Sequence, residues 1–144
     1  MTIELVKGFR DIEDCNKRIV IRSIIENTFK LYNFKPVETP TIEYEDFAKG
    51  ENVNDEAVSN IFRLKDRGER ELALRYEFTF QLKRLAKNKK LPYKRYQIGN
   101  VFRDEPVTLN RWREFTQCDV DIVGSSFIEE AEILKITSEI LKQL

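Results

Sequence analysis

The segment from Val101 to Ile122, VFRDEPVTLNRWREFTQCDVDI, is the feature that most constrains the fold of this chain. Both of its ends alternate apolar and polar residues with the period of a β-strand, and a polar stretch joins them. We therefore expect a β-hairpin with an outgoing strand over residues 93–103 and a returning strand over residues 112–124. Since side chains alternate along a strand, the many charges of this hairpin can be assigned to its two faces.

One face of the predicted hairpin collects its polar and aromatic side chains: Arg103, Arg113, Phe115, Gln117 and Asp121. The other face is more apolar, and we expect it to pack on helices: Ile98, Phe102, Cys118, Val120 and Ile122. The first face, which on the outgoing strand also carries Arg95, Gln97, Gly99 and Val101, would then stay open. It is either a solvated surface of cross-strand ion pairs, or a binding site in which arginines hold a phosphate and an aromatic ring stacks on a base.

The remaining patterns indicate helices and further strands around this hairpin. Amphipathic helices are predicted over residues 12–32, 79–87 and 127–144, an extended proline-containing segment over 34–44, a polar loop with a short helical piece over 46–60, and two strands over 61–65 and 71–77. Gly68 is expected to take a positive φ in the turn between these two strands. The order of elements predicts an α+β fold, an antiparallel sheet flanked by helices, in one domain spanning residues 1–144.

Composition narrows the chemistry that the chain can perform. The 144 residues are 41% apolar and 35% charged, as in an ordinary globular domain, and contain no histidine, which excludes histidine-dependent nucleophiles and metal sites. Cys15 and Cys118 match no metal-ligand spacing, so we expect two buried thiols and no metal site. Lysine plus arginine equals aspartate plus glutamate at 25 each, so no global positive field attracts nucleic acid. We find no membrane span or signal peptide, and expect a cytoplasmic protein without a membrane partner.

Two longer stretches resemble a known family. ELALRYEFTFQLKRLAKN and LPYKRYQIGNVFRDEPVTLNRWREFTQCDVDIVG closely resemble the catalytic domain of histidyl-tRNA synthetase, most of all its archaeal and eukaryotic branch. KGFRDI resembles the family's opening segment, and YNFKPVETPTIEY resembles class II motif 1. The resemblance covers essentially the whole chain and implies part of a class II aminoacyl-tRNA synthetase catalytic fold, with motifs 1 and 2 present. Motif 3 and the anticodon-binding domain are not found in these residues.

The resemblance also implies roles for individual residues. Arg103 would be the motif 2 arginine that holds the ATP α-phosphate, with Arg113 beside the triphosphate and Phe115 stacked on adenine. Glu105 and Arg111 would lie near ATP and the tRNA acceptor end. The histidine substrate would be held by Glu77, Thr79, Gln117 and Asp121. Asn110 departs from the family's glycine, but asparagine tolerates the left-handed region, so the turn can persist.

The implied reaction suits a chain without histidine. ATP activates histidine to histidyl-adenylate, with Mg²⁺ carried on the ATP phosphates, and the acyl group passes to tRNA(His). The expected partners are L-histidine, ATP, the tRNA acceptor end, and a second subunit bound through motif 1 or a complementing C-terminal part. One hypothesis is thus a catalytic-domain fragment, either a truncated piece or half of a split gene. The alternative is a non-catalytic synthetase-like regulatory or binding module.

Overall fold

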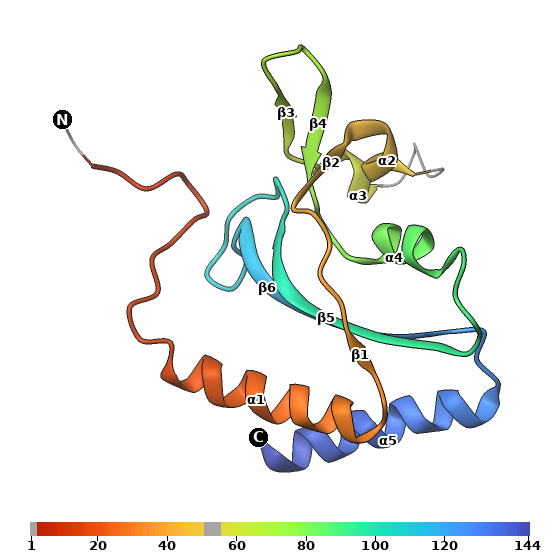
Figure 1. Ribbon diagram of the computed structural model, residues 1–144. Coiled ribbons are helices and arrows are strands. Elements are labelled where there is room, and N and C mark those ends of the chain that lie inside the picture. Colours follow the sequence, from red (N-terminus) through yellow and green to blue (C-terminus); the bar gives the residue numbers. More distant parts are fainter. Residues whose placement is uncertain (1–2, 51–55) are drawn as a thin grey trace. The chain divides into compact units, whose positions relative to one another are not determined.

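The computed structural model describes residues 3–50 and 56–144 (Figure 1). The chain groups into two compact units. The first unit consists of Met1–Arg10, Glu38–Leu85 and Ile98–Cys118, and the second of Asp11–Val37, Ala86–Gln97 and Asp119–Leu144. The two longest strands, β5 (Tyr93–Phe102) and β6 (Glu114–Val123), contribute residues to both units. No helix among the described residues is long and apolar enough to cross a bilayer.

The first unit contains a small antiparallel sheet in the order β2-β4-β3 (Figure 1). Its strands are β2 (Ile42–Tyr44), β3 (Arg63–Lys65) and β4 (Glu71–Leu74), and its helices are α2 (Glu45–Lys49), α3 (Glu56–Ser59) and α4 (Thr79–Ala86). Ala73 lies in the central strand, opposite Glu43 on one side and Arg63 on the other. A buried cluster supports this sheet: Ala48, Val58, Ile61, Ala73 and Tyr76, with Phe80 against it.

The turn between β3 and β4 differs from the prediction in one detail. Glu69, and not Gly68, has the positive φ, at 57°. The Asp66 carboxylate accepts hydrogen bonds from the backbone N–H groups of Gly68 at 2.8 Å and Arg70 at 3.1 Å. An aspartate that bonds its own turn in this way can determine where the left-handed residue falls. The prediction for Gly68 was therefore wrong by one position.

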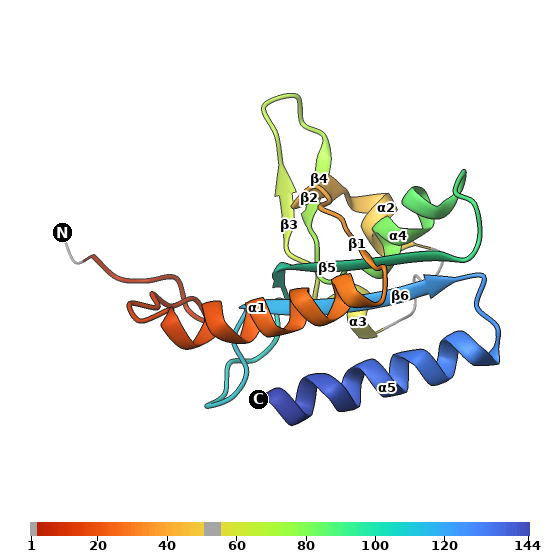
Figure 2. The ribbon, with the colours of Figure 1, turned by 60° about the horizontal axis from the view of Figure 1, so that its bottom comes forward.

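The second unit is built on two helices that lie side by side, α1 (Asn16–Leu31) and α5 (Phe127–Gln143) (Figure 2). Three aromatic rings make its centre, with Phe29 5.1 Å from Tyr96 and 6.0 Å from Phe34. Asn33 follows the end of α1 with a φ of 61°, and the N–H of Phe34 returns to the carbonyl of Phe29. The short strand β1 (Lys35–Pro36) then pairs in parallel with β5.

The predicted elements are all found, with shifted ends. The first helix begins at Asn16 instead of residue 12, and the strands are divided between two sheets, β1-β5-β6 and β2-β4-β3. The helical piece predicted within residues 46–60 corresponds to α2 and α3, and residues 51–55 of that segment lie outside the described part of the chain. The α+β fold class is confirmed.

Two predictions about burial were wrong. The polar face of the outgoing strand is not open, because Arg95, Gln97 and Val101 are buried, with exposed fractions of 0%, 2% and 0%. Within the first unit the reason is visible at Gly99, where an added Cβ would lie 3.0 Å from Arg75 Nη2 and 3.5 Å from Phe78 Cζ. The segment after β4 thus covers the part of this face that belongs to the first unit, at Gly99. Both cysteines, expected to be buried, are exposed.

Candidate functional site

Arg103 directly follows β5, and its backbone closes the connection to β6 by donating from N–H to the carbonyl of Arg113 at 2.8 Å. Its side chain is held in three ways. Nε donates to the carbonyl of Tyr76 at 3.2 Å, Nη2 donates to Oε1 of Gln117 at 3.2 Å, and the guanidinium carbon lies 5.0 Å from the centre of the Phe115 ring. Arg103, Phe115 and Gln117, which the period-2 pattern assigned to one face, are therefore brought together.

The contacts of Arg103 are all with uncharged groups. Within residues 3–50 and 56–144, no carboxylate lies within ion-pair distance of its guanidinium. A carbonyl and an amide oxygen orient the planar fork but do not neutralise its positive charge. The described structure thus presents a half-buried, oriented cation, which is suited to binding an anion such as phosphate.

Arg113 lies at the other end of the same connection and has different partners. Its Nε donates to the carbonyl of Glu105 at 3.1 Å, and its Nη2 lies 2.9 Å from Oδ1 of Asp104. Its own backbone N–H donates to the carbonyl of Gly8 at 2.9 Å. Arg113 therefore ties the two ends of the connection together, and part of its charge is already paired.

A cavity of about 510 Å³ opens beside Arg103. The predicted residues Arg103, Glu105, Arg111 and Phe115 line it, together with Asn110, Arg10 and Trp112. Arg111 lies 3.6 Å from Glu105, between Nη1 and Oε2. Backbone hydrogen bonds between Thr108 and Arg111 close the turn below, and Asn110 forms this turn without a positive φ.

Two cavity residues were missed by the sequence analysis, Arg10 and Trp112. The guanidinium carbon of Arg10 lies 4.5 Å from the centre of the Trp112 ring. Trp112 stands at the first position of the predicted returning strand, where alternation does not reliably assign a face, and the observed strand begins only at Glu114. Arg10 comes from a segment without regular structure. Their only signal was the family resemblance, which covers Arg10 in KGFRDI and Trp112 in NRWREF.

The residues predicted to bind histidine are less closely grouped. Gln117 contacts Arg103 directly, and Glu77 is half-buried and adjacent to Tyr76, whose carbonyl Arg103 uses. Thr79 is exposed and begins α4. Asp121 belongs to the second unit, where its Oδ2 lies 2.7 Å from Nη2 of the fully buried Arg95. Burial raises the pKa of the Asp121 carboxyl, Arg95 opposes that shift, and Asp119 adds to it.

The arrangement in the first unit combines a cation without an ion-pair partner among the described residues, an aromatic ring beside it, and further arginines around a cavity. The ring and the guanidinium can bind a flat base and a phosphate in the same site. Phosphate transfer chemistry of this kind depends on positioning and charge stabilisation rather than on a protein nucleophile.

Comparison with protein families gives one decisive match: residues 8–144 match the model of histidyl-tRNA synthetase. The chain belongs to the histidyl-tRNA synthetase family. Its curated relatives include "Histidine--tRNA ligase 1" of Bacillus anthracis, 43% identical over all of this chain, and "Histidine--tRNA ligase" of Helicobacter hepaticus, 38% identical over all of it. The chain spans about a third of the length of these relatives, 36% and 34% respectively.

Solved structures agree with the family. The histidyl-tRNA synthetase of Nostoc superposes with a TM-score of 0.81 at 28% identity, over 99% of this chain and 34% of that protein. The apo enzyme of S. aureus gives 0.79 at 26% identity, over 99% of this chain and 35% of that protein. These neighbours confirm the partial class II fold. All four of these relatives are bacterial, and they do not test the resemblance to the archaeal and eukaryotic branch.

Proposed function

We propose that this chain forms the motif 1 and motif 2 part of a histidine–tRNA ligase, which activates histidine with ATP and transfers it to tRNA(His). The observation that carries the proposal is Arg103, held by Tyr76 and Gln117 against the Phe115 ring, without a carboxylate partner among the described residues. Family membership supports the same activity, because the curated relatives are named as histidine–tRNA ligases.

In this proposal the first unit binds the nucleotide. Arg103 holds the α-phosphate, and Phe115 stacks on adenine. Arg113 lies beside the triphosphate, while Glu105 and Arg111 at the cavity rim meet ATP and the acceptor end of the tRNA. Apart from Arg113, which does not line it, these residues share the cavity, where two aromatic rings lie beside three arginines and a carboxylate.

Glu77, Thr79, Gln117 and Asp121 are proposed to bind histidine, through their carboxylate, hydroxyl and amide groups. Gln117 then has two tasks, because its Oε1 also accepts from Arg103 at 3.2 Å. An amide that contacts both the α-phosphate arginine and the amino acid would place the two substrates side by side. That proximity is what the first reaction step requires.

In the first step, a carboxylate oxygen of histidine attacks the α-phosphorus of ATP and forms a new P–O bond. The bond to the bridging oxygen breaks on the opposite side, and pyrophosphate leaves with the electron pair. Arg103 stabilises the negative charge that builds on the α-phosphate oxygens, so no protein nucleophile is used. In the second step, a ribose hydroxyl of the terminal adenosine of the tRNA takes the acyl group and AMP leaves.

Magnesium enters the proposal as part of the nucleotide substrate. Among residues 3–50 and 56–144, no group of three or more His, Cys, Asp or Glu side chains is placed to hold a metal ion. The metal would bind through the ATP phosphates, where its charge adds to that of Arg103. A homodimer formed through the motif 1 region, or a complementing C-terminal part, is proposed from the resemblance alone.

Full activity is expected to need the complementing C-terminal part, so the test is histidine-dependent exchange of pyrophosphate into ATP with that part supplied, together with calorimetric titration of ATP and of histidine. We expect Arg103→Ala to lower exchange by about 100-fold or more, since it removes a charge used in the transition state. Arg67→Ala is the matched control, because Arg67 is exposed in the β3–β4 turn. Full exchange by Arg103→Ala would contradict the assignment. Binding of neither ligand by the unaltered protein would indicate a regulatory or binding module instead.

A further inference from the structure

Three consecutive residues near the N-terminus, Gly8, Phe9 and Arg10, lie against the connection between β5 and β6. We call them the Gly8–Arg10 segment. Each of the three makes a different contact with this connection or with its support, although they are far from it in sequence. All of these contacts lie within the first unit.

Gly8 lies directly under Arg113. Its carbonyl accepts the Arg113 backbone N–H at 2.9 Å, and its φ is +88°. An added Cβ would lie 2.7 Å from both Cγ and Cδ of Arg113, and 2.9 Å from Cγ2 of Val107. The positive φ and the close approach both require glycine here. The backbone at Gly8 therefore supports the aliphatic stem of Arg113 directly.

Phe9 anchors the segment. Its ring lies 5.9 Å from Phe62 in an edge-on arrangement and 6.5 Å from Phe102 in a stacked one, between ring centres. Phe102 immediately precedes Arg103, and the guanidinium carbon of Arg113 lies 6.0 Å from the Phe62 ring. Aromatic pairs at these separations stabilise a contact beyond the area that they bury. The anchor thus reaches both ends of the β5–β6 connection.

Arg10 completes the contact at the cavity. Its guanidinium carbon lies 4.5 Å from the Trp112 ring centre, and both residues line the cavity beside Arg103 and Arg111. A cation above the face of a tryptophan is the strongest form of this interaction, and it restricts how the ring can turn. Arg10 therefore defines one wall of the cavity through Trp112.

We propose that the Gly8–Arg10 segment is a positioning element of the nucleotide site, which holds Trp112 and Arg113 in the orientation that ATP requires. The proposal rests on the proposed function for its ligand, and on contacts of the described residues for its geometry. Without the segment, the β5–β6 connection would have to become ordered when the nucleotide binds, and the entropic cost of that ordering would reduce the affinity for ATP. The segment is thus expected to affect ATP binding without touching the α-phosphate.

Two variants test the segment. Arg10→Ala removes the guanidinium from Trp112 at an exposed position, and Gly8→Ala forces the contact with Arg113 apart. We expect ATP affinity to fall about two- to fivefold in Arg10→Ala and about tenfold in Gly8→Ala. Arg10→Lys, which keeps a cation, should recover most of the loss. Lys7→Ala, which removes an exposed positive charge one position before the segment, should leave ATP affinity unchanged.

A second measurement does not depend on ATP. Trp112 is the only tryptophan of the 144 residues, so its fluorescence reports on this loop alone. Acrylamide should quench it more strongly in Arg10→Ala and Gly8→Ala than in the unaltered chain or in Lys7→Ala. If Gly8→Ala does not fold, the Arg10 variants still show whether the segment orders the β5–β6 connection.

The outcomes separate this proposal from the proposed function. If the unaltered protein binds ATP while the variants bind it equally well and show unchanged quenching, the positioning role is overturned and the nucleotide site stands. If the unaltered protein does not bind ATP, the proposed function fails, and the quenching alone decides whether the segment orders the loop. A parallel loss of ATP affinity in Lys7→Ala would also overturn the proposal, because general charge would then explain the effect.

Discussion

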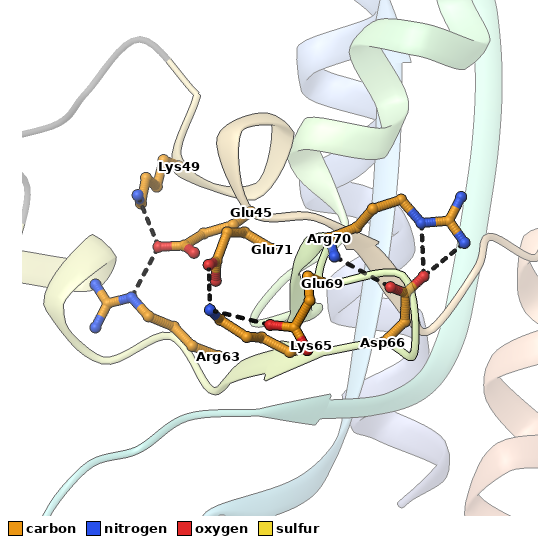
Figure 3. A network of polar contacts seen from close by, with 8 residues as sticks. All are labelled: Glu45, Lys49, Arg63, Lys65, Asp66, Glu69, Arg70 and Glu71. Carbon is orange, nitrogen blue, oxygen red and sulfur yellow. Dashed lines mark hydrogen bonds and ion pairs between the residues drawn. The ribbon is translucent and has the colours of Figure 1, made fainter.

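The β3–β4 hairpin and the β5–β6 connection are both rich in arginine, but they use it differently. In the hairpin three cations lie against carboxylates: Arg63 Nε is 2.8 Å from Glu45, Lys65 is 3.0 Å from Glu71, and Arg70 pairs with Asp66 (Figure 3). In the connection Arg103 contacts a carbonyl, an amide and an aromatic ring. Charge is dense in both regions, and Arg111 and Arg113 of the connection have carboxylate partners too, but Arg103 has none among the described residues.

The difference shows why a count of charges does not locate a site. Exposed ion pairs such as those of the hairpin contribute little to stability and leave no charge for a ligand. An arginine oriented by neutral acceptors keeps its charge and its geometry. Arg113 is intermediate, since it has both a carbonyl and the Asp104 carboxylate as partners. Substitutions can remove or strengthen this contrast, and the largest effect is expected at Gln117.

Gln117→Glu should make the connection resemble the hairpin. It places a carboxylate where an amide oxygen now lies 3.2 Å from Nη2 of Arg103, and the new ion pair would compete with phosphate. We expect ATP affinity, measured by calorimetry without histidine, to fall tenfold or more, roughly the effect of displacing a charged hydrogen bond. Gln117→Met, of similar size but uncharged, should lose much less. Equal losses in the two variants would show that neutralisation of Arg103 is not the cause.

Phe115→Leu removes the ring beside Arg103 and keeps an apolar side chain. If adenine stacks there, ATP affinity should fall about five- to tenfold, within the range measured for stacking of one base on one aromatic ring. Phe115→Tyr keeps the ring and should bind ATP nearly normally. The comparison of ATP with inorganic triphosphate is decisive, because only ATP carries a base. An equal loss for both ligands would place the base elsewhere.

Arg63→Ala removes an arginine of the β3–β4 hairpin whose charge is already paired. Arg63 is half exposed, with 53% of its side-chain surface accessible, and pairs with Glu45. Its loss should lower the free energy of unfolding by about 0.2 to 1 kcal/mol, measured in urea, and leave ATP affinity unchanged. A change in ATP affinity larger than twofold would contradict the separation of the two regions.

Acid should weaken the hairpin network through Glu45. Hydrogen bonds from Lys49 and then Arg63 hold the pKa of the Glu45 carboxyl below its usual value. The stabilisation is therefore fully present above the unfolded-state pKa, and is lost as the pH falls through the folded-state pKa. The free energy of unfolding should fall less steeply below about pH 4.3, the ordinary glutamate pKa, in Glu45→Gln than in the unaltered protein. Identical slopes would show that Glu45 contributes nothing to the pH dependence.

Much of this fold could be predicted from local patterns. The helical period located α1, α4 and α5, and alternation located β5 and β6 to within a few residues. The alternation of side chains along paired strands also placed Arg103, Phe115 and Gln117 on the same face, and the structure brings them into contact. The roles of these residues in binding ATP and histidine stay predictions.

The errors have a common physical origin. Alternation along a strand separates its side chains into two faces, but it does not predict which face will be covered by another segment of the chain. Arg95 and Gln97 were therefore placed on an open face, although they are buried. The prediction for Cys118 failed for the same reason: it was assigned to the apolar face that was expected to be covered, but it is exposed. Burial depends on contacts between residues far apart in the chain, and such contacts carry no local period.

The sequence by itself determined the elements, the family and the grouping of Arg103, Phe115 and Gln117, since short-range periodicity and a dense motif specify these. Only the tertiary structure decided which charges are already paired, and which segment supports the loop. The Gly8–Arg10 segment meets Trp112 and Arg113 only after the chain has folded. A cation becomes a ligand-binding group or half of an ion pair according to its neighbours in space.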